Sequence, residues 1–116
     1  MNYEKLEVWR KSMGVALLIH TSFKYCKDYG FKDQITRSAV SIPSNIAEGE
    51  ERETVKESVR FLYIAKGSTG ELYTQILLAK EFGYLEEQQY KLLQQDILQV
   101  SRMLAGLIKS RVYSVK

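Results

Sequence analysis

Residues that could take part in catalysis are few in this sequence of 116 residues. It holds one histidine, His20, and one cysteine, Cys26. On one helix these side chains would point to different faces, so the imidazole is not expected to activate the thiol. A metal site needs several converging ligands, and no Cys-x-x-Cys, His-x-x-x-His or Glu-x-x-His spacing occurs. We therefore predict a protein without enzymatic activity and without a metal or other cofactor.

Four carboxylates between residues 48 and 53 form the densest acidic cluster of the chain. They precede a predicted helix that begins at Thr54, where negative charge stabilises the positive end of the helix dipole. We interpret the cluster in this way rather than as an acid–base pair. The glycines match neither the phosphate-binding nor the dinucleotide-binding pattern, and no Gly-x-Ser-x-Gly occurs.

Basic residues are distributed unevenly, although the net charge is only +3. Residues 97–116 hold four Lys/Arg and no Asp/Glu, whereas residues 49–96 hold six Lys/Arg and nine Asp/Glu. Cations are favoured at the C-terminal end of a helix, and a phosphate-binding surface is the alternative interpretation. The candidate nucleic-acid contacts are Arg102, Lys109, Arg111 and Lys116, with Arg10, Lys11 and Arg37 as a second group.

The spacing of apolar residues predicts a single all-α domain over residues 1–116. Apolar side chains recur at alternating steps of three and four, which is the period of helices packed at a shallow angle. Thr54 and Glu57 have the spacing of a capping box, and Gly83 is expected to end the third helix. The expected helices cover residues 4–26, 32–48, 54–82 and 86–112. With short connections, they predict an antiparallel up-down four-helix bundle.

Pro43 lies within the second predicted helix, where a proline removes a backbone donor and is expected to kink the helix. Ser41 and Asn45 are close enough to satisfy carbonyls that a kink would free. Gly49 suits the position just past the end of that helix. In the third predicted helix, the small residues 67–70 predict a close crossing with a neighbouring helix.

The first predicted helix is apolar on two flanks. Its regular apolar seam, which we expect to face the core, is formed by Leu6, Trp9, Met13, Ala16, His20 and Phe23. The second flank holds Val8, Val15, Leu18 and Ile19. A helix with two apolar flanks is central in its domain or shared with another chain, and no helix is central in a four-helix bundle. We therefore predict self-association through the second flank; a wide core stripe is the alternative.

The sequence favours a cytoplasmic protein with no membrane partner. The longest uncharged apolar stretch, residues 12–23, is too short and too polar to span a bilayer. The N-terminal residues lack the basic and apolar segments of a signal peptide. A lone cysteine cannot form an internal disulfide, which fits a reducing compartment.

Four segments resemble a known family. They are LEVWRK at residues 6–11, DQITRSAVSIPSNIAEG at 33–49, AKGSTGEL at 65–72 and GYL at 83–85. Together they resemble the four-helix bundle proteins encoded in intervening sequences of bacterial 23S ribosomal RNA. The resemblance covers essentially the whole chain, and the SIPSNIAEG motif is its most specific part.

The resemblance implies a bacterial cytoplasmic four-helix bundle that assembles into a ring-like homopentamer and has no catalytic residues. It carries over Pro43 as a kink, Asn45 as a polar group beside that kink, and Glu48 with Gly49 as the exit of the second helix. The family is also similar to the accessory protein of diversity-generating retroelements, a basic pentamer that binds nucleic acid and a reverse transcriptase.

Two functions remain open from the sequence. The first is an oligomeric adaptor associated with RNA or DNA, and with a nucleic-acid-processing protein, through basic residues displayed around the ring. The second is a protein-interaction scaffold that binds no nucleic acid. The acidic middle of the chain and the modest net charge favour the scaffold, since acidic side chains repel phosphates.

Overall fold

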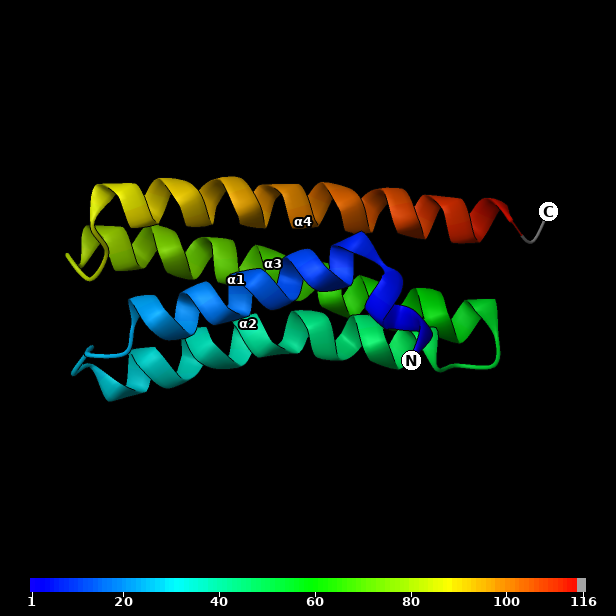
Figure 1. Ribbon diagram of the computed structural model, residues 1–116, viewed down its shortest axis with the longest axis horizontal. Helices are drawn as coiled ribbons and strands as arrows, with labels where there is room; N and C mark the ends of the chain where they lie inside the picture. The colour runs from blue at the N-terminus through cyan, green and yellow to red at the C-terminus, as the bar shows by residue number, and fades with distance from the viewer. Residues whose placement is uncertain (115–116) are drawn as a thin grey trace.

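The computed structural model describes residues 1–114, which form four antiparallel α-helices after a short N-terminal 3-10 turn. The elements are η1 (Asn2–Lys5), α1 (Glu7–Ser22), α2 (Tyr29–Glu50), α3 (Val55–Glu81) and α4 (Glu87–Tyr113). Each helix packs on the next and α4 also packs on α1, which closes a bundle of 48 × 21 × 20 Å. The α1–α2 and α3–α4 connections lie at one end and the α2–α3 connection at the other (Figure 1). The predicted four-helix arrangement is confirmed.

The ends of α3 agree with the predicted bounds because local hydrogen bonds define them. The Thr54 hydroxyl accepts a hydrogen bond from the Glu57 amide at 3.2 Å, which is the forward half of the predicted capping box. Gly83 has a φ of 79°, and the Tyr84 amide donates to the Ala79 carbonyl at 2.8 Å. This backbone pattern is a Schellman motif, which ends the helix at a glycine.

The bounds of α1 and α2 differ from the prediction. Residues 4–26 were expected to form one helix, but Leu6 has an extended backbone with ψ of 125° and separates η1 from α1. The second helix begins at Tyr29 rather than at residue 32, because the Asp28 carboxylate accepts a hydrogen bond from the Phe31 amide at 3.2 Å. A side chain expected in a turn is therefore the N-cap of α2.

Small residues pack differently from the prediction. Gly49 lies inside α2, and a Cβ at this position would sit 3.0 Å from the Ser58 carbonyl oxygen of α3. Its role is a close approach between two helices rather than a helix exit. A Cβ at Gly67 or Gly70 would meet nothing within 4 Å, so the predicted crossing at residues 67–70 is wrong for these two glycines.

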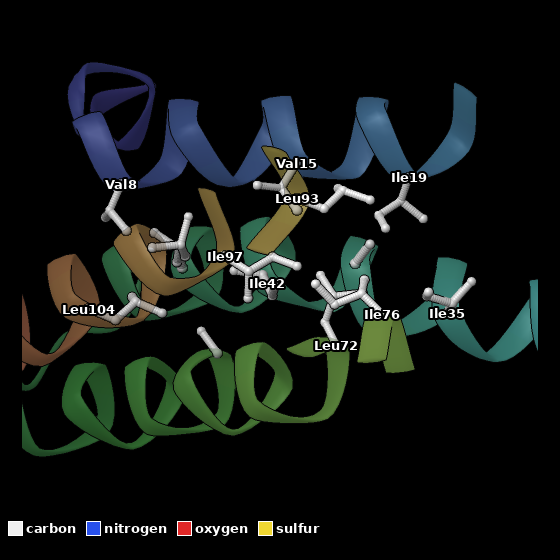
Figure 2. Close-up of a cluster of buried hydrophobic side chains, with 14 of the residues drawn as sticks. Val8, Val15, Ile19, Ile35, Ile42, Leu72, Ile76, Leu93, Ile97 and Leu104 are labelled. Atoms are coloured by element: carbon white, nitrogen blue, oxygen red, sulfur yellow. The ribbon is translucent and has the colours of Figure 1, made fainter. Parts of the chain in front are cut away.

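The core is aliphatic and draws on every helix (Figure 2). The largest fully buried side chains include Ile19 of α1, Ile35 and Ile42 of α2, Leu72 of α3 and Ile97 of α4. The sequence pattern predicts that the buried seam of α4 consists of Tyr90, Leu93, Ile97, Val100, Leu104 and Leu107. The first five are buried, whereas Leu107 is only partly buried and Ile108 is buried beside them.

The predicted orientation of α1 is wrong. Val8, Val15 and Ile19, expected at an intermolecular surface, are 5%, 1% and 0% exposed and point into the core (Figure 2). Leu18 is partly buried against the same core. The buried side of α1 is difficult to recognise in the sequence because Ser12 interrupts its apolar residues. Ser12 is fully buried and donates its hydroxyl to the Trp9 carbonyl at 2.8 Å, which makes it compatible with an apolar core.

The expected core seam of α1 lies mostly at the edge of the core rather than inside it. Met13 is 37% exposed, His20 is exposed, and Trp9 and Ala16 are partly buried. Phe23, which follows the helix, is the member of this set that is fully buried.

The polar residues around Pro43 form a local network. The Asn45 amide donates to the Ser41 carbonyl at 2.8 Å and to the Ser41 hydroxyl at 2.9 Å. The Ser41 and Ser68 hydroxyls are 2.9 Å apart and join α2 to α3. The carbonyl that lacks a backbone donor because of Pro43 is that of Ala39, four residues earlier. Asn45 donates to the Ser41 carbonyl instead. Glu48 pairs with Arg52 one turn later.

Candidate functional site

Three of the predicted nucleic-acid contacts are engaged within the chain. Arg111 donates to the Ser58 hydroxyl at 2.9 Å, and its second terminal nitrogen lies 2.5 Å from a carboxylate oxygen of Glu50. Lys11 lies 3.1 Å from the Asp96 carboxylate, which ties α1 to α4. The Arg10 side chain donates to the backbone carbonyl of residue 4 at 2.7 Å. These contacts join the three cations to groups of the same chain, and their part in nucleic-acid binding stays a prediction.

The remaining candidates are distributed over two helices. Arg102 and Lys109 are exposed on α4, and Arg37 is exposed on α2. Lys116 lies outside the described residues.

The side of α3 that borders α4 adds a cation that the sequence analysis missed. Lys66, Tyr73 and Lys80 are spaced by seven residues, or about two turns, so they share one side of the helix. The Tyr73 hydroxyl accepts from the Gln94 amide at 3.1 Å and Lys80 lies 3.6 Å from Glu87. Both contacts are with α4, so Lys66 also lies beside α4.

The register of the antiparallel helices places Lys66 of α3 opposite the segment of α4 that holds Arg102. Because the helices are antiparallel, the residue seven before Tyr73 lies opposite the residue seven after Gln94, and Arg102 is next to that position. Tyr63 is 58% exposed one turn before Lys66. We call Tyr63, Lys66, Arg102 and Lys109 the basic face. Residues 58–70 of α3 and 97–113 of α4 hold no Asp or Glu.

A second surface feature is an apolar groove between α1 and α2, with a volume of about 480 Å³. Trp9, Met13 and Leu17 line it from α1, and Val40 and Pro43 line it from α2. Leu17 is 64% and Val40 51% exposed. We call these five residues the α1/α2 groove. The side chains expected in the core thus contribute to an exposed apolar surface instead.

Aromatic residues at the end of the bundle form a clasp between the α1–α2 and α3–α4 connections. The Tyr84 hydroxyl donates to the Asp28 carboxylate at 2.6 Å, and the Tyr84 ring packs edge-on against Phe31 and Phe82. The hydrogen bond from Tyr84, joined by that from the Phe31 amide, lowers the pKa of Asp28. The same bond raises the pKa of Tyr84. This geometry is structural, since the polar groups satisfy one another.

Residues 1–114 contain no group of three or more His, Cys, Asp or Glu side chains that could hold a metal ion. None of the described helices is long and apolar enough to cross a membrane.

A comparison with protein-family models identifies the family of this chain. The family model described as 23S rRNA-intervening sequence protein matches residues 4–106. The chain belongs to this family. The resemblance stated from the four sequence segments is therefore confirmed.

A member of the S23 ribosomal protein family from Bacteroides thetaiotaomicron has a similar crystal structure, with a TM-score of 0.82 and 25% sequence identity. The match covers 88% of this chain and 98% of that protein, which is described as having unknown function. No curated protein matches this chain. Family membership thus accounts for the fold, and a functional inference depends on the surfaces of the chain.

Proposed function

We propose that this family member is a non-catalytic, self-associating protein that holds single-stranded RNA on the basic face. The proposal is supported by two facing stretches of α3 and α4 that hold Lys66, Arg102 and Lys109 and no acidic residue. Cations arranged in this way neutralise successive phosphates. Tyr63 adds an exposed ring one helical turn away from Lys66, and bases of any identity stack on such rings.

Self-association strengthens this proposal because one chain offers few cations. The fields of several basic faces add when the subunits are held together. The ring-like pentamer implied by the family resemblance would repeat the basic face around an axis.

The α1/α2 groove is the surface we assign to self-association, with a second copy of the chain as its occupant. The diagonal helix α3 carries a different exposed apolar group, with Ile64, Leu78 and Phe82 41%, 43% and 53% exposed. Two unlike apolar surfaces on one chain allow head-to-tail association, and such contacts form a ring when the rotation closes. We include in this proposal a bend of α2 at Pro43, which lines the groove.

Substitution in the groove tests the assembly. Met13→Lys with Leu17→Lys should yield monomers by sedimentation velocity while far-UV circular dichroism stays helical, because both side chains are exposed within one chain. Leu92→Lys, at a 48% exposed position of α4, is the matched control and should leave the assembly intact. A wild-type monomer at micromolar concentration would contradict the self-association proposal. Pro43→Ala should weaken the assembly, and an unchanged particle mass would remove Pro43 from the interface.

A protein-interaction scaffold is the second candidate, because an apolar groove of this kind also accepts an amphipathic helix of another protein. The acidic balance of residues 49–96 favours it.

Binding of fluorescently labelled single-stranded RNA separates the two candidates. Arg102→Gln with Lys109→Gln should weaken RNA binding several-fold, since both remove cations from the basic face. Lys5→Gln with Lys27→Gln removes the same charge from exposed positions elsewhere and should have a smaller effect. No binding by the wild-type protein at low salt, or equal losses in both variants, would favour the scaffold.

A further inference from the structure

A polar recess of about 400 Å³ lies between α2 and α3, and it shares no lining residue with the basic face or the α1/α2 groove. All of its lining residues are polar: Gln34, Arg37, Ser38, Ser41, Glu71 and Gln75. Its floor is fixed by hydrogen bonds between the two helices. Ser38 is 4% exposed and donates to one Glu71 carboxylate oxygen at 2.7 Å, and Ser41 pairs with Ser68. The carboxylate is thereby held in a defined position.

Two groups of the recess, the Gln75 side-chain oxygen and the Arg37 guanidinium, have no hydrogen-bond or ion-pair partner among the described residues. The side-chain oxygen of Gln75 is buried and accepts no hydrogen bond. Arg37 and Glu71 line the same recess but are not within ion-pair distance of each other, and neither forms a salt bridge elsewhere in residues 1–114. The recess thus presents two acceptors, at Glu71 and Gln75, together with one strong donor at Arg37.

A ligand that satisfies this set needs neighbouring N–H donors for Glu71 and Gln75 and an acceptor for Arg37. Guanine carries N1–H beside its exocyclic amino group, and its O6 and N7 atoms are the acceptors that arginine recognises. Adenine and cytosine present a ring acceptor beside a single amino group, which would face the carboxylate unfavourably. Uracil offers one N–H between two carbonyl oxygens.

We propose that this recess binds an unpaired guanine base, with Glu71 and Gln75 accepting from its Watson–Crick edge and Arg37 donating to its O6 and N7 edge. The proposal rests on the proposed RNA-binding function and names its base preference. The Watson–Crick edge is free only in single-stranded segments, which are the regions of RNA that proteins read by sequence. An arginine side chain of a protein partner fits less well, because it has only donors and would repel Arg37.

Nucleotides added to the full-length protein test the recess. GMP should bind saturably and shift the backbone amide resonances of Ser38 and Gln75 in NMR spectra. IMP, which lacks the exocyclic amino group, should bind about tenfold more weakly, because it loses a hydrogen bond to a charged or buried acceptor. AMP carries the same phosphate and should bind no more than weakly. Equal binding of GMP and AMP would overturn the proposal.

Variants of α3 assign the binding to the recess. Glu71→Gln keeps an oxygen for Ser38 but loses the carboxylate, and it should abolish the preference for GMP over AMP. Glu81→Gln removes an exposed carboxylate of the same helix outside the recess and should leave the preference unchanged. A preference that survives Glu71→Gln, or binding of an arginine-containing peptide in place of GMP, would contradict the proposal.

The recess and the basic face can fail independently. Salt-dependent binding of polyuridylate without binding of GMP would overturn the recess and leave the proposed function intact. Binding of GMP without binding of polyuridylate would overturn RNA binding by the basic face and support the recess as a nucleotide site.

Discussion

Ile19 and Leu17 lie two residues apart on α1, and their substitution by alanine should have very different effects on stability. Ile19 is 0% exposed within the chain, whereas Leu17 is 64% exposed in the α1/α2 groove. Truncating a fully buried isoleucine leaves a cavity and costs about 2–5 kcal/mol of unfolding free energy. Leu17 buries only the smaller part of its surface in one chain, so its truncation should cost less than about 1 kcal/mol.

Urea unfolding followed by far-UV circular dichroism measures both losses. The experiment should be run at two protein concentrations, because self-association stabilises the folded chain by mass action. The loss for Ile19→Ala should be large at both concentrations, and any loss for Leu17→Ala should appear mainly at the higher one. Equal losses in dilute protein, or a larger loss for Leu17→Ala, would refute the assigned orientation of α1.

Two further predictions concern single contacts. Gly49→Ala should destabilise the fold by about 1–3 kcal/mol in thermal or urea unfolding because its Cβ would crowd Ser58, whereas Gly70→Ala, in open space, should stabilise it by roughly 0.5–1 kcal/mol; the reverse order would contradict the α2–α3 packing. Tyr84→Phe removes the largest cause of the lowered pKa of Asp28. A lowered carboxyl pKa stabilises the fold above the unfolded-state pKa of about 3.9, and this stability is lost as pH falls through the folded-state pKa. The variant should therefore lose less stability than wild type between about pH 5 and pH 2, and parallel profiles would contradict the assigned bond.

The helix count, and the extents of α3 and α4, could be predicted because their signals are local. Thr54 caps α3, Gly83 ends it, and a regular apolar period over residues 90–108 identifies the buried side of α4. Each of these features depends on neighbours within a few residues, so no tertiary information was needed.

The orientation of α1 could not be predicted for a physical reason. Both of its flanks are apolar, and the flank that faces the core contains Ser12, which looks unsuitable for burial until its bond to the Trp9 carbonyl is seen. The other flank contains the larger side chains Trp9 and Met13, which favoured the wrong choice. Hydrophobicity alone does not distinguish a core stripe from a groove.

The basic residues could be identified from the sequence, but which of them form ion pairs within the chain could not. Arg111 and Lys11 meet Glu50 and Asp96, which are 61 and 85 residues away along the chain. Such pairings depend on the packing of whole helices, so the sequence placed Arg111 in the same group of candidates as Arg102 and Lys11 in the second group.

The salt dependence of RNA binding tests the central claim most directly. The association constant of the wild-type protein for a single-stranded RNA should fall linearly with salt on a double-logarithmic plot, with a slope of about −0.7 per phosphate contact. The three cations of one basic face would give roughly −2, and a steeper slope is expected if several subunits contact one strand. Arg102→Gln with Lys109→Gln should make the slope shallower. A slope near zero, or one that this variant leaves unchanged, would contradict RNA binding by the basic face.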